Sequence, residues 1–378
     1  MALSRDERDE LRSSARALLA RESPSTRVRA VIEEPPGFDR HLWDQMVELG
    51  WTSLHVDPDL GGGGAGYAEL GVILHELGRA LVPSPFLSSA VLATAALTRS
   101  ENDPLAKELL VALVNGELLG AVAFASSRGS YEPSQLSTEW ERAGAGLRLQ
   151  GSAGFVLDAD VADVLVVAAS DSVGMPAIVA VDRTVPGVQI ERAATVDATR
   201  RLFTVSFDDV VVPEARMLCA PGTRADELLD QILAVGVIAA ACDATGVAEQ
   251  ALEQAVRHAT DRVQFGKPIG TFQAVKHHCA NIAIAVAASG AAVRGACEAL
   301  DGDPREWATS AAVTSSFVGP ACADACALAL RVHGGIGFTW EHDSHLYLKR
   351  TQLDQVLFGT PSWHRRRLAT TVIAGVEA

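Results

Sequence analysis

Aromatic residues and net positive charge are both scarce in this sequence of 378 residues. Aromatics make up 5%, and 32 Lys and Arg residues stand against 47 Asp and Glu residues, which gives a formal net charge of −15. This balance argues against broad nucleic-acid binding, because that function needs a basic face. It also disfavours docking to anionic membrane lipids. The length predicts two or three domains instead of one compact core.

Cysteine is sparse as well, and its spacing does not suggest a metal site. The six cysteines include no CxxC pair, and Cys322 and Cys326 lie four residues apart in an alanine-rich stretch. We therefore expect buried thiols and neither metal ligands nor disulfides. The charged first residues do not resemble a signal peptide, and no uncharged apolar run reaches about 18 residues. These absences predict a cytoplasmic protein with no membrane insertion.

Several common catalytic and cofactor motifs are missing. No serine lies in a GxSxG pattern, and no GxGxxG joins a predicted strand to a predicted helix. A hydrolase elbow and a Rossmann cofactor site are therefore not expected. The run GGGG at 61–64 lacks a following GK[ST], so it predicts a flexible loop and not a phosphate loop. His333, His342 and His345 include no i, i+4 pair on a predicted helix, so no metal site is expected.

Helical patterns occupy both ends of the chain. Ser4 followed by Glu7 is a capping box, and Asp103-Pro104 fits an N-cap followed by the first helical residue. Apolar residues at helical spacing, with alanine-rich composition, predict helices over 41–49, 68–81, 226–260, 272–300 and 307–333. Gly334-Gly335 is a helix-stop signal, and Pro83 and Pro85 are expected to break the chain.

The middle of the chain carries short runs with a period near two. The runs LLGAVAF, LRLQGSAGFVL, VLVVAA, AIVAVD and LFTVSFDDVVV are separated by Gly, Asp and Pro. Several short strands in about a hundred residues favour a small barrel or sandwich. The predicted fold class is α+β and multidomain, with a helical domain at 1–116, a β domain at 117–222 and a helical bundle at 223–378.

Two motifs of the last segment have chemical potential. DRVQFGKPIGTFQAVKH joins two predicted helices, with Arg262 and Lys267 near the corner. The amides that begin a helix are electropositive, so an anion such as a pyrophosphate could bind here, although a solvated turn explains the same pattern. RVHGGIGFTWEHD has three glycines in four positions, which permits close backbone approach to a ligand or simply ends a helix.

The order of segments and these motifs together resemble the acyl-CoA dehydrogenase family. LWDQMVELGWTSLHVDPDLGGGG, VSFDDVVVPEARML, DRVQFGKPIGTFQAVKH and RVHGGIGFTWEHDSHLYLKR carry the resemblance over nearly the whole chain. It implies a helical domain, a β domain and a four-helix bundle, with FAD bound between domains and across a subunit interface of a dimer or tetramer. It also implies oxidation of the α–β carbon bond of an acyl-CoA substrate, with electron-transfer flavoprotein as acceptor.

The resemblance assigns cofactor contacts residue by residue. Arg262 would meet the pyrophosphate of a neighbouring subunit's FAD, and Gln273 and the glycine pair would hold its adenosine half. Thr360 would contact flavin in its own subunit. The full set implied at this level is Arg262, Gln264, Phe265, Gln273, Gly334, Gly335 and Thr360.

The family's catalytic base is missing at its usual position. A carboxylate must remove the proton α to the thioester, while hydrogen-bond donors stabilise the charge on the thioester oxygen. Much of the family places a glutamate directly before Gly-Thr near the C-terminus, and this chain has Phe358 there. Other members place the base on the first long helix of the last domain, at a position that corresponds to Gly236. Asp243, about 10 Å further along that helix, is a weak candidate for a relocated base, and packing at a domain interface is the alternative.

The β domain departs from the family pattern too. Ser126 and Ser127 are the hydroxyls left where a flavin-lining loop is expected, and Phe155-Val-Leu157 replaces a tryptophan-X-threonine motif. Phe155 could still stack on a flavin, but Leu157 cannot donate a hydrogen bond. The resemblance therefore implies that the half-site built by this chain for itself is degraded, while the half-site that it lends to a neighbour is intact.

This asymmetry favours a base-less subunit that works in an α2β2 assembly with a homologous partner. Such pairs in the family act on acyl-CoAs with bulky ring systems, including steroid side chains. Three alternatives stay open at this level: a self-sufficient dehydrogenase that uses Asp243, a flavin-dependent monooxygenase or oxidase on the same fold, and a non-catalytic scaffold. A homo-oligomer is an alternative to the mixed assembly.

Overall fold

The N-terminal part of the computed structural model, which describes residues 3–144 and 146–377, is helical. The capping box forms as predicted, because the Glu7 amide bonds Ser4 Oγ at 3.3 Å and the Ser4 amide bonds Glu7 Oε2 at 2.7 Å. Asn102, and not Asp103, is the N-cap of its helix. The helices are α1 (Arg5–Glu22), α2 (Ser25–Glu33), α3 (Arg40–Glu48), α4 (Tyr67–Arg79), a π-helical turn (Phe86–Ala93), α5 (Thr94–Thr98) and α6 (Asp103–Val114).

The glycine-rich loop after α3 is fixed by its backbone. The Gly63 amide bonds the Ser53 carbonyl and the Gly64 amide bonds the Val56 carbonyl, both at 2.9 Å. A Cβ at Gly62 would lie 2.1 Å from the Val56 carbonyl oxygen. The expectation of a flexible loop is therefore wrong, since these glycines allow a close backbone approach that any side chain would block.

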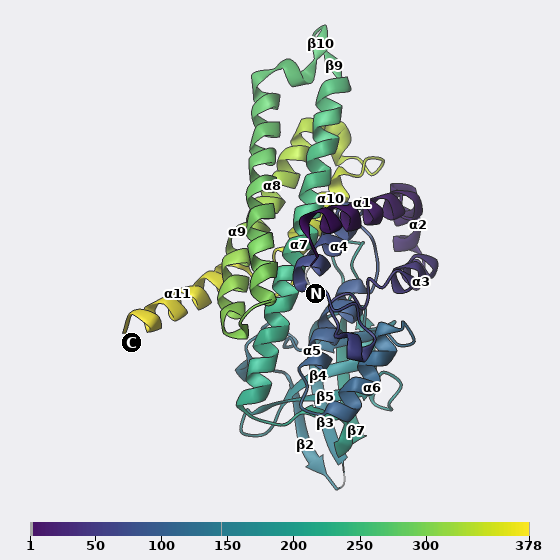
Figure 1. Cartoon of the computed structure of the whole chain (residues 1–378), viewed down its shortest axis with the longest axis vertical. Coiled ribbons are helices and arrows are strands. Elements are labelled where there is room, and N and C mark those ends of the chain that lie inside the picture. The colour runs from purple at the N-terminus through teal and green to yellow at the C-terminus, as the bar shows by residue number, and fades with distance from the viewer. Residues whose placement is uncertain (1–2, 145, 378) are drawn as a thin grey trace.

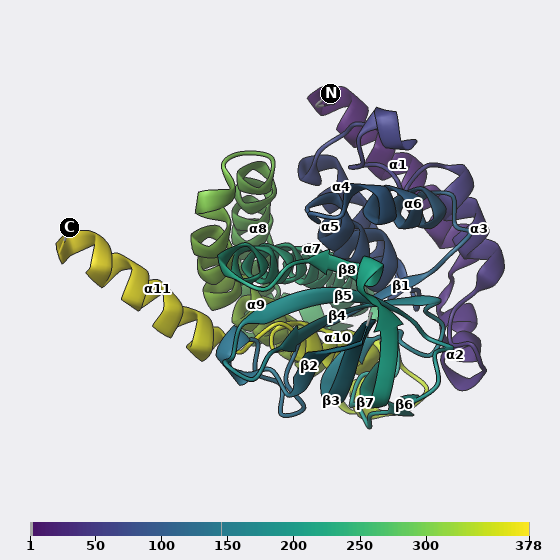
Figure 2. The same ribbon diagram turned by 90° about the horizontal axis from the view of Figure 1, so that it is seen from below.

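The middle of the chain forms one eight-stranded mixed sheet. Its order is β6-β7-β3-β2-β4-β5-β8, and β1 pairs with β4 in parallel. The end strands β6 and β8 do not pair with each other in the described chain, so the sheet is open. Its inner residues form a separate apolar core, and Figure 2 shows β2, β3 and β7 side by side in the sheet. The strands are β1 (Gly120–Ala123), β2 (Thr138–Ala143), β3 (Gly146–Leu157), β4 (Val164–Ser170), β5 (Pro176–Asp182), β6 (Val188–Arg192), β7 (Leu202–Pro213) and β8 (Met217–Cys219).

The C-terminal part is a helical bundle centred on one long helix. α7 packs against α4, α8, α9 and α10, and nearly all of its middle is buried. The tip between α7 and α8 carries a two-stranded ribbon and stands at the upper end of Figure 1, while α11 projects to one side. The elements are α7 (Thr223–Asp261), β9 (Val263–Gln264), β10 (Lys267–Pro268), α8 (Gln273–Leu300), α9 (Trp307–His333), α10 (Ser344–Asp354) and α11 (Pro361–Glu377).

Three helical stretches are long and apolar enough to cross a bilayer by length and composition. They were not expected from the sequence, because only apolar runs without any charged residue were considered there. The apolar window of α7 is 94% buried inside the protein, so packing accounts for it. The corresponding windows are 22% buried in α8 and 50% buried in the stretch Pro304–Phe338 that contains α9. Much of the apolar surface of α8 therefore faces outward.

Candidate active site

The two positions at which the resemblance implies a base meet in this structure. Phe358 follows α10 and Gly236 lies in the middle of α7, and a Cβ built on Gly236 would be 3.1 Å from the Phe358 ring. The same Cβ would lie 3.2 Å from the side chain of Leu92, in the π-helical turn. Two segments 122 residues apart thus converge on one point, and neither supplies a carboxylate there.

Side chains fill the space around this point. Phe358 is 4% exposed, and its ring centroid lies 6.3 Å from that of Phe124 and 6.1 Å from that of Tyr131. The Tyr131 hydroxyl donates to the Leu357 carbonyl, and His364 Nε2 donates to the Phe358 carbonyl at 2.9 Å. The cavity next to Phe358 has a volume of about 20 Å³, room for roughly one water molecule. An acyl chain does not fit this cavity.

His364 makes the support of Phe358 sensitive to acid. Burial lowers the pKa of His364 to about 4, below an unfolded value of about 6.5. Because the folded pKa is depressed, the stability is present above about pH 6.5 and is lost as pH falls toward 4. We expect the free energy of unfolding to drop by about 2 kcal/mol from this group between about pH 7 and 5.

Urea unfolding at both pH values measures that drop. His364→Gln should reduce it, while the exposed His41→Gln should leave it unchanged. An equal drop in the wild-type protein and the His364 variant would contradict the assignment.

Asp243 does not have the environment of a general base. Its two carboxylate oxygens each accept a hydrogen bond of 2.9 Å from Arg350, and Arg200 lies 3.3 Å away. Burial alone would raise the pKa of Asp243, but the charges of Arg350 and Arg200 outweigh burial and hold this pKa below its ordinary value. A base must be free to accept a proton near neutral pH. The geometry supports the alternative of packing at a domain interface.

The half-site predicted from the β domain is brought together, although its hydroxyls are engaged locally. Ser126 Oγ accepts from the Ser130 amide at 3.0 Å, and Ser127 Oγ lies 3.2 Å from Ser137 Oγ. Phe155 is 45% exposed at a φ of 54°, and a Cβ at Gly129 would lie 2.8 Å from its ring. Phe155 therefore projects over the turn that contains the two serines.

The residues predicted to reach a neighbour's cofactor lie at the exposed end of the bundle. Phe265 is 91% exposed, and Arg262, Gln264 and Gln273 are exposed as well. The Arg262 guanidinium forms no ion pair or hydrogen bond within residues 3–144 and 146–377. A Cβ on Gly334 or Gly335 would meet open space within 4 Å. An unpaired cation beside exposed glycine backbone fits a pyrophosphate ligand.

Two histidines join these segments. The rings of His258, near the end of α7, and His333, at the end of α9, have centroids 4.8 Å apart. This contact places the Arg262 corner next to the Gly334-Gly335 turn. Sequence patterns do not reveal this contact, because a pair of histidines 75 residues apart has no local signature.

Thr360 has a structural function in the chain itself. Its Oγ1 accepts a hydrogen bond of 3.2 Å from the Trp363 amide, at the start of α11. The side chain thus caps a helix N-terminus. It is exposed beside Phe358 and Gly359, so a flavin contact stays a prediction.

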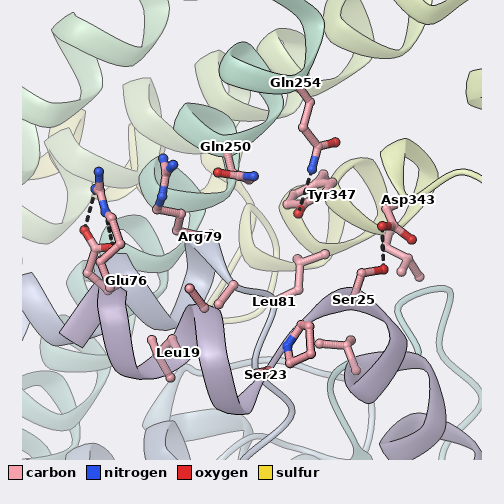
Figure 3. Close-up of a pocket in the computed structure, with 16 residues that line it drawn as sticks. Leu19, Ser23, Ser25, Glu76, Arg79, Leu81, Gln250, Gln254, Asp343 and Tyr347 are labelled. Atoms are coloured by element: carbon pink, nitrogen blue, oxygen red, sulfur yellow. Dashed lines mark hydrogen bonds and ion pairs between the residues drawn. The ribbon is translucent and has the colours of Figure 1, made fainter. Parts of the chain in front are cut away.

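A larger cavity lies away from these residues. It has a volume of about 410 Å³ and is bounded by α1, α2, α4, α7 and α10 (Figure 3). Its charged groups are paired, since Arg16 bonds Glu76 at 2.8 Å and Asp343 bonds Ser25 and Arg29. None of the residues with a predicted site function lines it.

Comparison with known proteins agrees with the fold. Residues 5–117 match the family described as Acyl-CoA dehydrogenase, N-terminal domain, and residues 227–373 match Acyl-CoA dehydrogenase, C-terminal domain. Acyl-CoA dehydrogenase IpdE2 of Mycobacterium tuberculosis is 32% identical over 97% of this chain and 98% of its own length. The chain belongs to the acyl-CoA dehydrogenase family, whose members are flavoprotein oxidoreductases acting on CH–CH bonds.

Solved structures show the same architecture. The ChsE4-ChsE5 complex from Mycobacterium tuberculosis contains a chain that matches with a TM-score of 0.87 and 25% identity, over 98% of both chains. A Tcur3481-Tcur3483 steroid ACAD variant matches with a TM-score of 0.88 and 26% identity over 99% of both chains. A glutaryl-coenzyme A dehydrogenase complex at 22% identity and a TM-score of 0.91 supports the fold alone.

Proposed function

We propose that this chain is the base-less subunit of an FAD-dependent acyl-CoA dehydrogenase and works with a homologous partner subunit. The observation that carries the proposal is the meeting of Gly236 and Phe358. Both positions that hold the base in the family are occupied by residues that cannot accept a proton, and the space between them is filled. The proposed function of this chain is then to contribute cofactor-binding residues to the active site of its partner.

The residues that would contribute to the partner's site lie at the junction of α7 and α8 and directly after α9. Bound FAD would accept the hydride from the β carbon of the substrate. Arg262 would neutralise the pyrophosphate, the exposed backbone at Gly334-Gly335 would allow close approach, and Gln273 would hydrogen-bond the adenosine half. Gln264 and Phe265 follow Arg262, on the ribbon and its turn, and would contact the partner.

The names of relatives support a proposal for the substrate class. Benzylmalonyl-CoA dehydrogenase of Aromatoleum aromaticum is 28% identical, and cyclohex-1-ene-1-carbonyl-CoA dehydrogenase of Geobacter metallireducens is 29% identical, each over about nine-tenths of this chain. Together with the steroid ACAD, they favour an acyl-CoA that carries a ring system. We infer electron-transfer flavoprotein as the acceptor, in line with the CarC subunit named with an Etf complex in Acetobacterium woodii.

Purification with and without the partner tests the proposal. The chain alone is expected to hold little FAD and to show no flavin bleaching with a ring-bearing acyl-CoA. Co-expression with the product of an adjacent homologous gene should restore both. Stoichiometric FAD with rapid bleaching by the chain alone would reject the proposal, and oxygen uptake driven by NADH and reduced flavin would indicate a monooxygenase instead.

Arg262 provides a matched variant within the complex. Arg262→Ala should weaken FAD binding by at least about tenfold, because a charge-assisted contact to phosphate contributes about 1.5–3 kcal/mol. Arg257→Ala, an exposed arginine near the end of the same helix, should leave FAD binding unchanged. Equal losses for the two variants would show that Arg262 does not contact the cofactor.

A further inference from the structure

Five charged side chains are buried together between α7, α10 and the loop before β7. They are Arg200, Arg350, Asp197, Asp243 and Asp354, and none is more than 7% exposed. The cluster joins the β domain to the C-terminal bundle, since Asp197 and Arg200 come from the first and the other three from the second. Asp354 also lines the small cavity beside Phe358.

The hydrogen bonds of the cluster assign partners to most of its charges. Arg350 binds Asp243 through both Nε and Nη2, and its Nη1 donates to Thr199 Oγ1 at 2.8 Å. Arg200 Nε donates to Asp354 Oδ1 at 3.1 Å. Asp197 Oδ1 accepts from the amide and the hydroxyl of Thr199 at 2.9 Å and 2.7 Å.

One carboxyl group is in excess. The cluster holds two guanidinium groups and three carboxyl groups, so full ionisation would bury a net negative charge. Asp354 Oδ2 and Asp197 Oδ2 both lack a hydrogen-bond partner in the described chain, and each lies 4.0 Å from Arg350. Asp197 Oδ1 accepts two hydrogen bonds and Asp354 Oδ1 accepts one, so Asp354 has the weaker support for a negative charge. An excess negative charge is strongly unfavourable in a buried cluster, and the carboxyl group with the weakest hydrogen-bond support takes up a proton instead.

We propose that Asp354 is a protonated, neutral carboxylic acid at neutral pH, and that this proton holds the C-terminal end of α10 in place. Asp354 is the last residue of α10, and Phe358 follows it after one short segment, Gln355 to Leu357. Loss of the proton would leave a net charge between α7 and α10. Asp354 is thus a positioning residue for the segment that fills the candidate site.

Neighbouring groups are consistent with this assignment. Burial raises the pKa of Asp354; Arg200 opposes the shift and the charge of Asp243 adds to it. From α9, the thiols Cys322 and Cys326 lie near Asp354, and burial raises their pKa values, so neither adds a charge to the cluster near neutral pH. From the end of β3, Asp158 lies near Arg200, and burial raises its pKa to about 6.

The sign of the pH effect follows from the direction of the shift. A group with a folded pKa above its unfolded value of about 3.9 stabilises the fold below that unfolded value and loses the contribution as pH rises through the folded pKa. Ionisation of Asp354 should therefore weaken the packing of α10 against α7 on the alkaline side.

Two isosteric variants test the proposal, because asparagine mimics a neutral carboxylic acid. Wild-type melting temperature should fall as pH rises from about 6 to 9, and Asp354→Asn should remove most of this fall. Asp158→Asn is the matched control, and it should alter only the part of the profile near pH 6. The hydrogen-exchange protection factors of the amides at Gln355, Val356 and Gly359 should become pH-independent in Asp354→Asn, like those of amides in α8.

Infrared spectroscopy of the wild-type protein tests the proton without a variant. At about pH 8 the carbonyl band of a buried protonated carboxyl group is expected, while Asp158 is ionised at that pH. Absence of the band would overturn the proposal. An Asp354→Asn variant that keeps the wild-type pH slope, or is destabilised equally at every pH, would overturn it as well.

Discussion

Asp243→Asn is expected to lower the free energy of unfolding by about 3–5 kcal/mol. The change removes one partner of a buried ion pair and leaves Arg350, which is 2% exposed, without its bidentate carboxylate. Removing one member of such a pair costs far more than the pair contributes, because the remaining charge stays buried. The effect distinguishes a structural carboxylate from a catalytic one, since a base can be replaced by its amide with little change in stability.

Chemical denaturation of the chain at about pH 7 provides the measurement. Asp9→Asn is a suitable control, because Asp9 pairs with Arg12 at 2.8 Å on an exposed face of α1 and such pairs contribute at most about 1 kcal/mol. A variant at Asp243 that is as stable as the wild-type protein would contradict the structural function.

Phe358→Ala is expected to lower the free energy of unfolding by about 3–5 kcal/mol, because the phenyl ring is buried and its removal opens a cavity. Gly236→Ala should cost about 1–3 kcal/mol on its own, since the added methyl group would press on Phe358 and Leu92. The two changes together should cost less than their sum, because the smaller residue at 358 relieves the contact.

A double-mutant cycle measured by urea unfolding tests this coupling. Gly295→Ala is the control on a neighbouring helix, where an added Cβ meets nothing within 4 Å. Additive costs for Gly236→Ala and Phe358→Ala would show that the two positions do not share one space.

Local rules predicted the parts of the fold whose signals lie within a few residues. The Ser4–Glu7 capping box and the end of α9 at Gly334 are such signals, and both form. The π-helical turn at Phe86–Ala93 was missed, because two prolines precede it and its residues are all buried, which leaves no apolar periodicity. Strand β2 was missed because three of the six residues of TEWERA are charged and only one is β-branched.

The candidate site shows the same division. The sequence alone shows that position 358 holds a phenylalanine and not an acid, and it also shows the motifs around Arg262 and Gly334. The contacts that explain these residues are long-range: Arg350 lies 107 residues from Asp243, and Tyr131 lies 226 residues from Leu357. Asp243 became a candidate base because sequence distance along a helix carries no information about a cation on another helix.

The outward apolar face of α8 links the folding of this chain to its concentration. Only 22% of the most apolar 18-residue window of that helix is buried within the chain, so most of this window is at least partly exposed to solvent. Any surface that binds this face in the folded protein and not in the unfolded one stabilises the fold by mass action. The melting temperature then rises with the concentration of the chain or of its partner. A melting temperature measured in dilute solution is therefore lower than that of the assembled protein.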